Sequence, residues 1–324
     1  MLAAGCGSTA EEEADNTSTT EEEVDNTSTT EEEADNTSTT EEEADNTSTT
    51  EEEEDEDSSE HEVTVDPVSD AFITEQRQAL AASTDGAGFG PQSPRDIDSS
   101  GGNNARLFEA APPYTEMNLC NIHFHENAEH KGGEFTVYAG NGDGEGNGTG
   151  FAYSGELTDL EVAPYDSVVG ASEHGDLEPG DTIEVHYVYT SAEIEPGPTL
   201  ESCLSESIQN PQLRVETQVY VLVNGDGARD FTELTRLDEI DGLHQAVSIP
   251  SDTGTPVEYA GSTTGPGYNE VGSPFQVTWS VRPGVARVSI SSVDAWLQDN
   301  VFDEDHAHGV RNLVTNTDLL SEIG

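Results

Sequence analysis

Two short histidine motifs are the residues of this chain best suited to chemistry. His123-Phe124-His125 places two imidazoles two residues apart, and Glu184-Val185-His186 supplies a third later in the chain. On a β-strand, side chains two residues apart point to the same face, about 7 Å from one another. His123 and His125 can therefore bind one metal ion together. Three neutral nitrogen ligands leave the fourth tetrahedral position of zinc open, as in catalytic zinc sites. We predict a Zn²⁺ site formed by His123, His125 and His186.

Two further residues fit the surroundings of such a site. Asn121 and Glu184 each stand two residues before a predicted ligand, on the same face of its strand. Metal-bound imidazoles usually donate their second N–H to a carbonyl or carboxylate oxygen, which fixes the orientation of the ring. We expect Asn121 to support His123, and Glu184 to support His186. By the same alternation Cys120 lies on the opposite face from His123 and is not a ligand.

Other folds also use a His-x-His pair. In a cupin barrel His123, His125 and a distant histidine would bind the metal together with Glu129. A cupin then places Pro-x-Gly two residues before its last histidine, whereas Pro179-Gly180 lies farther from His186 here. A cupin-type metal-dependent oxygenase or isomerase is thus one alternative function. A non-catalytic metal-binding surface protein is another, favoured if Thr263 lies far from the metal.

Longer strings around these motifs resemble one family. MNLCNIHFHENAEHKGGEF, GDTIEVHYVYT, SDTGTPVEYAGSTTGPGYN, QVTWSVRP and EDHAHGVR look like the delta-class carbonic anhydrases over roughly residues 106–324. The same landmarks resemble the active-site motifs of the alpha class more loosely. The resemblance implies a carbonate dehydratase, a lyase in which zinc-bound hydroxide reversibly hydrates carbon dioxide to bicarbonate and a proton. Carbon dioxide and bicarbonate would be its small-molecule partners.

The resemblance also implies roles for individual residues. Thr263 or Thr264 would orient the hydroxide and donate its own hydroxyl hydrogen to Glu129. The chain has one residue fewer before this threonine pair than the alpha-class pattern, so the choice between the two stays open. Val188 and Trp279 would line the apolar pocket for carbon dioxide.

The remaining histidines leave the proton carrier open. His130 follows Glu129 and would point to the opposite face if the strand continued. His306 and His308 stand in the acidic segment 303–308, which we expect to be a solvated loop. His61, His174 and His244 do not belong to any motif of candidate ligands or catalytic residues in the sequence. The native metal and the oligomeric state are not decided by the sequence either.

The elements that must position these residues are mainly strands. After residue 105, short runs of Val, Ile, Tyr, Phe and Thr alternate with clusters of Gly, Pro, Asn and Asp, which is typical of β-structure. We predict a mainly β domain with few helices over residues 106–324, built on one central twisted, largely antiparallel sheet like that of alpha carbonic anhydrases. We expect strands at 134–138, 151–154, 182–190, 213–223 and 275–281. We expect helices at 74–82, 291–299 and 310–321. The Gly-rich segment 141–148 is expected to form a hairpin loop.

Composition sets the protein apart by its acidity. The 324 residues hold 68 acidic and 10 basic side chains, a net charge of −58. The first 66 residues contain 26 of the acids and neither Lys nor Arg, which leaves 42 acids against 10 basic residues in the rest. Such charge disfavours binding to nucleic acid or anionic lipid headgroups. It also indicates adaptation to a saline medium, because salt screens self-repulsion.

The N-terminal part is organised differently from the rest. Residues 11–50 are four copies of a ten-residue acidic unit, and 11–62 lack the apolar residues needed for a core, which predicts a disordered tether. Residues 1–10 resemble the end of a bacterial lipoprotein signal, in which Cys6 would carry the lipid. This lipid anchor would be the protein's only contact with a membrane. Whether the true start lies upstream of Met1 stays open. Residues 63–105 are interpreted as a linker and N-terminal extension.

The cysteines agree with export. Cys120 and Cys203 both fall in motifs that the family shares, and we expect a disulfide between them, since exported proteins fold under oxidising conditions. Together with the tether and Cys6, this predicts an exported protein of a salt-adapted bacterium, periplasmic or at the cell surface and lipid-anchored.

Overall fold

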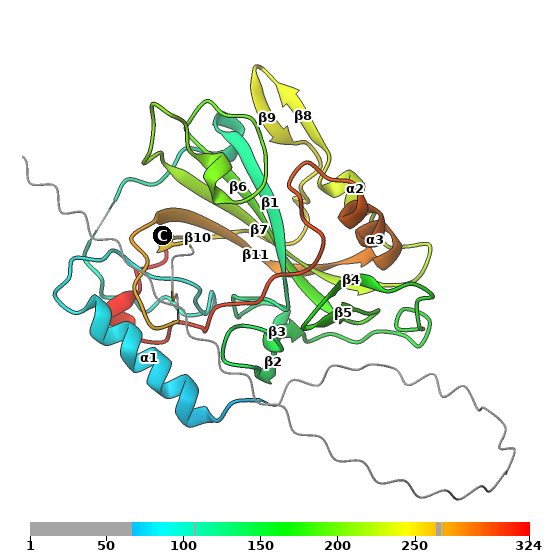
Figure 1. The fold of residues 1–324 in the computed structure, drawn as a ribbon, viewed down its shortest axis with the longest axis horizontal. Helices are drawn as coiled ribbons and strands as arrows, with labels where there is room; N and C mark the ends of the chain where they lie inside the picture. Colours follow the sequence, from blue (N-terminus) through cyan, green and yellow to red (C-terminus); the bar gives the residue numbers. More distant parts are fainter. Residues whose placement is uncertain (1–66, 107, 264–266, 268) are drawn as a thin grey trace, which may run out of the picture. The chain divides into compact units, whose positions relative to one another are not determined.

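A computed structural model of the chain describes residues 67–324 apart from 107, 264–266 and 268 (Figure 1). All of these belong to one compact unit, Ser59–Gly324. The predicted tether, Cys6, His61 and Thr264 lie outside the described residues. Within the described ranges, every helix is too short or too polar to span a bilayer.

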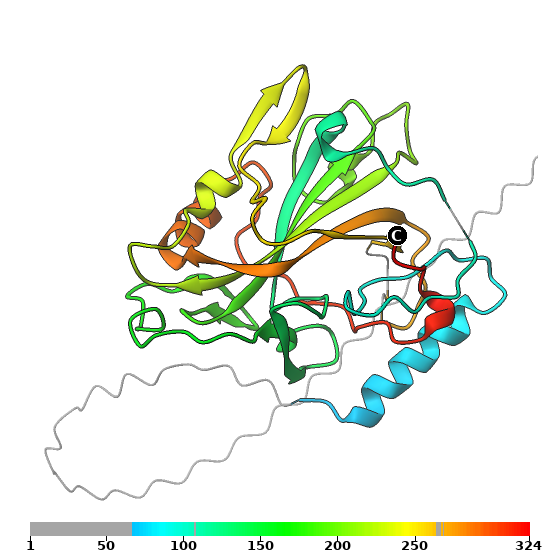
Figure 2. The same cartoon turned by 180° about the vertical axis from the view of Figure 1, so that it is seen from behind.

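A five-stranded sheet forms the centre of the unit. Its strands run in the order β1 (Asn118–Glu126), β6 (Thr182–Thr190), β7 (Leu213–Val223), β11 (Gln276–Ser289) and β10 (Val257–Ser262). β11 curves across the other strands on its way along the sheet (Figures 1 and 2). The fold class is therefore as predicted, mainly β around one central sheet.

The direction of one strand pair refines the prediction. β1–β6, β6–β7 and β10–β11 are antiparallel, but β7 and β11 are parallel. Parallel neighbours need a long crossover connection rather than a tight hairpin. The segment between β7 and β11 provides it, because it holds α2 (Phe231–Leu234), β8 (Leu237–Ile240), β9 (Leu243–Ala246) and β10. The sheet is thus mixed.

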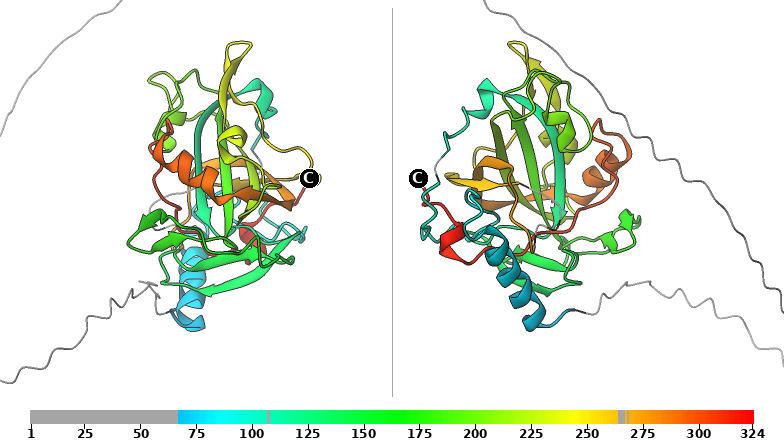
Figure 3. Two further views of the ribbon diagram at one scale, coloured as in Figure 1. Left: turned by 90° about the vertical axis from the view of Figure 1, so that its right-hand side faces the viewer. Right: turned by 60° about the vertical axis from the view of Figure 1, so that its left-hand side comes forward.

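Both faces of the sheet are covered, which explains why its central strands are buried almost throughout. All nine residues of β6 are buried. Alternate residues enter two cores: Ile183, Val185 and Tyr187 face a cluster that includes Trp296 of α3 (Ile290–Gln298), whereas Val188 faces a cluster with Trp279. Figure 3 shows α2 and α3 next to each other beside the sheet. The second face, with Trp279, carries the histidines.

Three small two-stranded sheets lie around the central one. They pair β2 (Phe135–Asn141) with β3 (Thr149–Tyr153), β4 (Val169–Ser172) with β5 (Gly175–Leu177), and β8 with β9. The Gly-rich segment 141–148 joins β2 to β3, as predicted. The predicted strands 182–190 and 213–223 match β6 and β7, and the other three expected strands overlap β2, β3 and β11.

The helices were predicted less well. α1 (Asp70–Thr84) contains the expected helix 74–82, and α3 agrees with 291–299 to within a residue. The expected helix 310–321 is wrong: only the 3-10 turn Thr317–Leu319 forms there. Its backbone instead bonds to other segments, with Val310 N–H donating to Gly146 O and Val314 N–H to Pro94 O. Tertiary hydrogen bonds have overridden local helix preference in this segment. Two further 3-10 turns span Tyr114–Glu116 and Leu200–Cys203.

The predicted disulfide between Cys120 and Cys203 is formed and joins β1 to the turn Leu200–Cys203. The expected orientation of Cys120 is wrong. The register of β1 against β6 shifts between Leu119 and Asn121, so Cys120 is the extra residue of a β-bulge. It packs in the cluster that holds Val188 and Trp279, on the same face as the histidines.

Candidate metal centre

The antiparallel register of β1 and β6 brings the three predicted ligands together. His123 lies directly opposite His186, and His125 follows on the same face of β1. One nitrogen from each of the three rings lies within 4.8 Å of the others. The Nδ1 atom of His186 is 3.2 Å from Nε2 of His123. Residues from two separate parts of the chain thus form one compact group of imidazole nitrogens.

Each ring is oriented by a hydrogen bond from its outer nitrogen. His123 Nδ1–H donates to Asn121 Oδ1 at 2.6 Å, and His186 Nε2–H donates to Glu184 Oε1 at 2.7 Å, which are the two partners that the sequence suggested. His125 Nδ1–H donates to the carbonyl oxygen of Gly309 at 2.7 Å. With all three outer nitrogens donating, the inner ones carry lone pairs that face one another.

The charge state of the rings also suits a metal. Burial, followed by the charges of His186 and His125, lowers the pKa of His123 well below its usual value. Burial lowers the pKa of His125 to about 4. Neutral imidazole is the form that binds metal ions. A group of three imidazoles without a thiolate or carboxylate ligand fits zinc with one coordination position left over.

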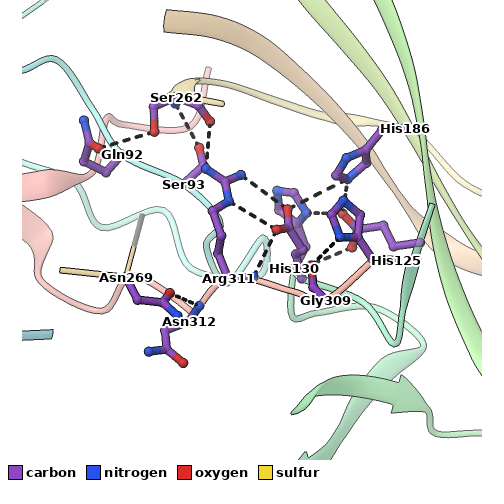
Figure 4. A network of polar contacts seen from close by, with 12 residues as sticks. Gln92, Ser93, His125, His130, His186, Ser262, Asn269, Gly309, Arg311 and Asn312 are labelled. Atoms are coloured by element: carbon purple, nitrogen blue, oxygen red, sulfur yellow. Dashed lines mark hydrogen bonds and ion pairs between the residues drawn. The ribbon is translucent and has the colours of Figure 1, made fainter. Parts of the chain in front are cut away.

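A second layer of buried polar groups stands behind His186 (Figure 4). Glu184 Oε1 also accepts from His130 Nδ1–H at 2.7 Å, and Glu184 Oε2 accepts from the His130 backbone N–H at 3.1 Å. On its other side His130 Nε2 lies 2.6 Å from the Tyr259 hydroxyl. Burial alone would raise the pKa of Glu184. The charges and hydrogen bonds of His130 and His186 outweigh this effect and bring the pKa well below its usual value. Glu184 therefore stays ionised against His186.

The prediction that His130 points away from Glu129 is wrong. β1 ends at Glu126, and Asn127 adopts a positive φ of 64°, so the alternation of a strand no longer applies. Glu129, His130, Glu184 and His186 form one buried group.

Glu129 is bound by an arginine that the sequence did not single out. Arg311 donates from Nε and from its backbone N–H to Glu129 Oε1, both at 3.1 Å, and from Nη2 to Oε2 at 3.3 Å. Burial alone would raise the pKa of Glu129, but the charge and hydrogen bonds of Arg311 outweigh it and bring the pKa below its usual range. Arg311 lies between Ser262 and the histidines in Figure 4. Its signal in the sequence was its place at the end of the string EDHAHGVR, which carries part of the family resemblance.

The threonine neighbourhood adjoins this group. Ser262 O, next to Thr263, accepts from Trp279 Nε1–H at 3.1 Å and from Arg311 at 3.5 Å. Thr263 itself donates its backbone N–H to Phe275 O. Among the described residues no hydrogen bond joins the Thr263 hydroxyl to Glu129, and Thr264 lies outside them. The roles of the two threonines stay predictions.

Val188 and Trp279 were predicted to line a carbon dioxide pocket, and this role stays a prediction. Val188 and Trp279 are buried in one apolar cluster. The Trp279 ring centroid is 5.0 Å from that of His186 and 4.9 Å from that of His130. Trp279 therefore packs beside both His186 and His130.

His308 is exposed, as expected of a solvated loop, but its segment lies beside the histidine group. The segment that carries it runs along β1, with His308 N–H donating to Phe124 O and Glu126 N–H donating to His308 O. Its ring centroid lies 5.8 Å from that of His123. His308 Nε2–H donates to Glu304 at 2.6 Å, which raises the pKa of His308. His306 pairs with Asp305, and His174 and His244 lie within 4.0 Å of exposed glutamates.

Comparison with known proteins gives one family. The family model described as delta carbonic anhydrase matches residues 114–292, which include His123, His125 and His186. No curated protein sequence matches the chain.

Similar solved structures include an alpha-carbonic anhydrase from Thermovibrio ammonificans in complex with sulfanilamide, at 16% identity and a TM-score of 0.26, covering 71% of this chain and 85% of that one. Another is the alpha-carbonic anhydrase of Photobacterium profundum, at 15% identity and a TM-score of 0.26, covering 76% and 95%. A halotolerant carbonic anhydrase from Dunaliella salina, at 17% identity and a TM-score of 0.26, covers 44% of this chain and 51% of that one.

Proposed function

Since the chain belongs to the delta carbonic anhydrase family and is thus a lyase acting on carbon dioxide and bicarbonate, we propose that its catalytic metal is zinc, bound by His123, His125 and His186. The observation that carries the proposal is the direction of the hydrogen bonds. Three oxygen acceptors take the three outer N–H groups, so that three inner nitrogens converge. When bound, zinc lowers the pKa of a coordinated water from 15.7 to about 7, a value that comes from carbonic anhydrase itself.

The residues around the ligands would fix the geometry of the attack. Because Arg311 keeps Glu129 ionised, Glu129 can only accept hydrogen bonds. A threonine hydroxyl that donates to Glu129 must then use its oxygen to accept a hydrogen bond from the attacking group. We assign this task to Thr263 or Thr264. Val188 and Trp279 would keep water away from the side of His186 where carbon dioxide binds.

The cupin alternative does not agree with these contacts. A cupin would use Glu129 as a metal ligand, but Arg311 binds both of its carboxylate oxygens. The centre of the unit is a five-stranded sheet with two edges, not a small barrel. A purely structural metal site is disfavoured because the segment of Thr263 adjoins the group.

For the setting of the protein we keep the interpretation of the sequence as a proposal: an exported, lipid-anchored enzyme of a saline medium, attached through Cys6 and the acidic tether. The Cys120–Cys203 disulfide supports export, since such bonds persist in oxidising compartments. Intact-mass spectrometry of the native protein would contradict the anchor if Cys6 carried no lipid.

Stopped-flow measurement of carbon dioxide hydration tests the function. We expect activity in the purified protein, loss on treatment with a chelator, recovery on addition of zinc, and loss in His186→Ala. His244→Ala is the matched control, because the half-buried His244 side chain lies 3.5 Å from the exposed Glu195 and outside the histidine group, and this variant should keep full activity. An oxygen-dependent reaction with bound iron would support the cupin instead.

A further inference from the structure

We propose that the loop tied to β1 by the disulfide orients Asn121, and through it the ligand His123, so that the Cys120–Cys203 bridge sets how tightly the site binds zinc. The inference rests on the proposed zinc site. It concerns a positioning role, since neither Gly197 of the loop nor the bridge touches the metal-binding nitrogens.

The side-chain amide of Asn121 has two ends with different partners. Its Nδ2–H donates to Gly197 O at 3.1 Å, and its Oδ1 accepts from His123 Nδ1–H at 2.6 Å. An amide turned by 180° has almost the same shape but points its N–H₂ group at the ring. His123 would then have to accept at Nδ1 and carry its hydrogen on Nε2, the nitrogen that faces the other ligands. The carbonyl of Gly197 disfavours that state, because a turned amide would present an oxygen to it.

The loop 197–203 is attached to Cys120 at both of its ends. The backbone N–H of Gly197 donates to Cys120 O at 3.0 Å. At the other end of the segment 197–203, Cys203 is joined to Cys120 by the disulfide. Inside the loop, the Ser202 hydroxyl donates to Pro198 O at 2.7 Å. The loop is therefore a short closed structure whose position relative to β1 depends on the bridge.

The β-bulge places the bridge next to the amide. Because Cys120 is the extra residue of β1, Cys120 and Asn121 both project toward the face that carries the ligands. Asn121 is 1% exposed, so solvent does not replace Gly197 as its partner. A regular strand would have put the disulfide on the opposite face of β1 from Asn121.

A double-mutant cycle on zinc affinity tests the coupling. The dissociation constant of Zn²⁺ is measured with a competing chelating indicator in the wild type, Asn121→Ala, Cys120→Ala/Cys203→Ala, and the triple variant. Loss of a partner of a metal ligand typically weakens binding 10- to 100-fold, and we expect Asn121→Ala to fall in about this range. We expect the cysteine pair to weaken binding about tenfold when Asn121 is present, and less than about twofold when it is alanine.

Equal effects of the cysteine pair in both backgrounds would overturn the inference, because a loss of general stability does not depend on Asn121. Circular dichroism checks that each variant is folded. If the cysteine pair does not fold, Gly197→Ala serves with the bridge intact. Its Cβ would lie 2.9 Å from Ser202 Oγ, so the Ser202 hydroxyl must move, which disturbs its hydrogen bond to Pro198 O inside the loop. The same dependence on Asn121 is expected, and its absence overturns the proposal.

The two proposals fail in different ways. A wild-type protein that binds no zinc would contradict the proposed function. A wild type that binds zinc and hydrates carbon dioxide, but whose zinc affinity is unchanged without the bridge, would contradict only the role of the loop.

Discussion

Arg311 binds both carboxylate oxygens of Glu129, with Nε 3.1 Å from Oε1 and Nη2 3.3 Å from Oε2. The Arg311 side chain is 4% exposed and that of Glu129 2%, so the pair is almost completely removed from water. It connects the irregular C-terminal segment to the residues behind the metal ligands. An ion pair in this position affects both stability and the charge state of Glu129.

Replacement of Arg311 should therefore lower both the stability and the activity of the protein. Breaking a buried pair by removing one partner typically costs about 3–5 kcal/mol, because the other charge is left without compensation. We expect Arg311→Met to lower the free energy of unfolding by about that amount in urea titrations and to reduce carbon dioxide hydration at least tenfold. Arg311→Lys should be intermediate, because lysine keeps the charge but loses the two-pronged contact.

Arg236 provides the matched control. It pairs with Glu233 at the surface, with its side chain 49% exposed, and surface pairs contribute about 1 kcal/mol or less. Arg236→Met should leave both stability and activity near those of the wild type. Equal losses in the two methionine variants would mean that the burial of Arg311 has no special effect.

The disulfide gives a chemical prediction. Titration of the denatured, unreduced protein with a thiol reagent should detect neither Cys120 nor Cys203, whose sulfurs are joined. Closing a loop of 83 residues disfavours the unfolded chain by at most about 4.5 kcal/mol. Reduced protein should accordingly unfold at lower urea concentration. Two reactive thiols assigned to these positions by peptide mapping would contradict the fold of β1.

Stability should also depend on the pH through Asp181. Burial, and then the charges of Glu126 and Glu178, raise the pKa of this carboxyl to about 7, although it accepts a hydrogen bond from Glu178 N–H. Between its usual value of 3.8 and 7 the folded protein keeps a proton that the unfolded chain releases. The contribution of Asp181 to the free energy of unfolding is therefore fully present below pH 3.8 and is lost as the pH rises through 7.

Asp181→Asn removes that dependence. One unit of pKa corresponds to about 1.4 kcal/mol, so the rise from 3.8 to about 7 sets an upper limit of about 4 kcal/mol. We expect the variant to be more stable than the wild type by up to that amount at pH 8, and little different at pH 4. The exposed Asp226, changed to Asn, should alter neither value. Melting temperatures across this pH range provide the measurement, and parallel curves for wild type and Asp181→Asn would refute the prediction.

Salt should stabilise the protein. The net charge of −58 creates self-repulsion that ions screen, and the Debye length falls from about 10 Å at 0.1 M salt to about 3 Å at 1 M. The melting temperature should rise by several degrees between dilute buffer and 1 M NaCl. A melting temperature that stays constant would argue against adaptation to a saline medium.

The sequence contained the centre of the site but not its full surroundings. Strand periodicity alone places His123, His125 and Asn121 on one face, and it does the same for Glu184 and His186 on β6. These predictions needed only local geometry. That His186 joins His123 and His125 was predicted on the assumption that its strand lies beside theirs, and periodicity alone does not give the register that sets His186 opposite His123.

The groups that were missed come from places where periodicity ends. Arg311 belongs to the segment 310–321, which was expected to be helical but whose backbone bonds to distant residues instead, and Gly309 lies directly before it. His130 follows a turn at Asn127 that ends the strand, and Cys120 sits in a bulge that reverses its face. In each case a tertiary contact, and not the local pattern, decided where the side chain points.

Zinc K-edge X-ray absorption on the purified protein tests the central claim most directly, because it counts the ligands of the metal. We predict one zinc per chain with three imidazole nitrogens at about 2.0–2.1 Å and one further light ligand. His123→Ala, His125→Ala and His186→Ala should each lose most of the metal. Sulfur in the zinc shell, a fourth protein ligand in place of solvent, or full zinc content in any of these three variants would contradict the account.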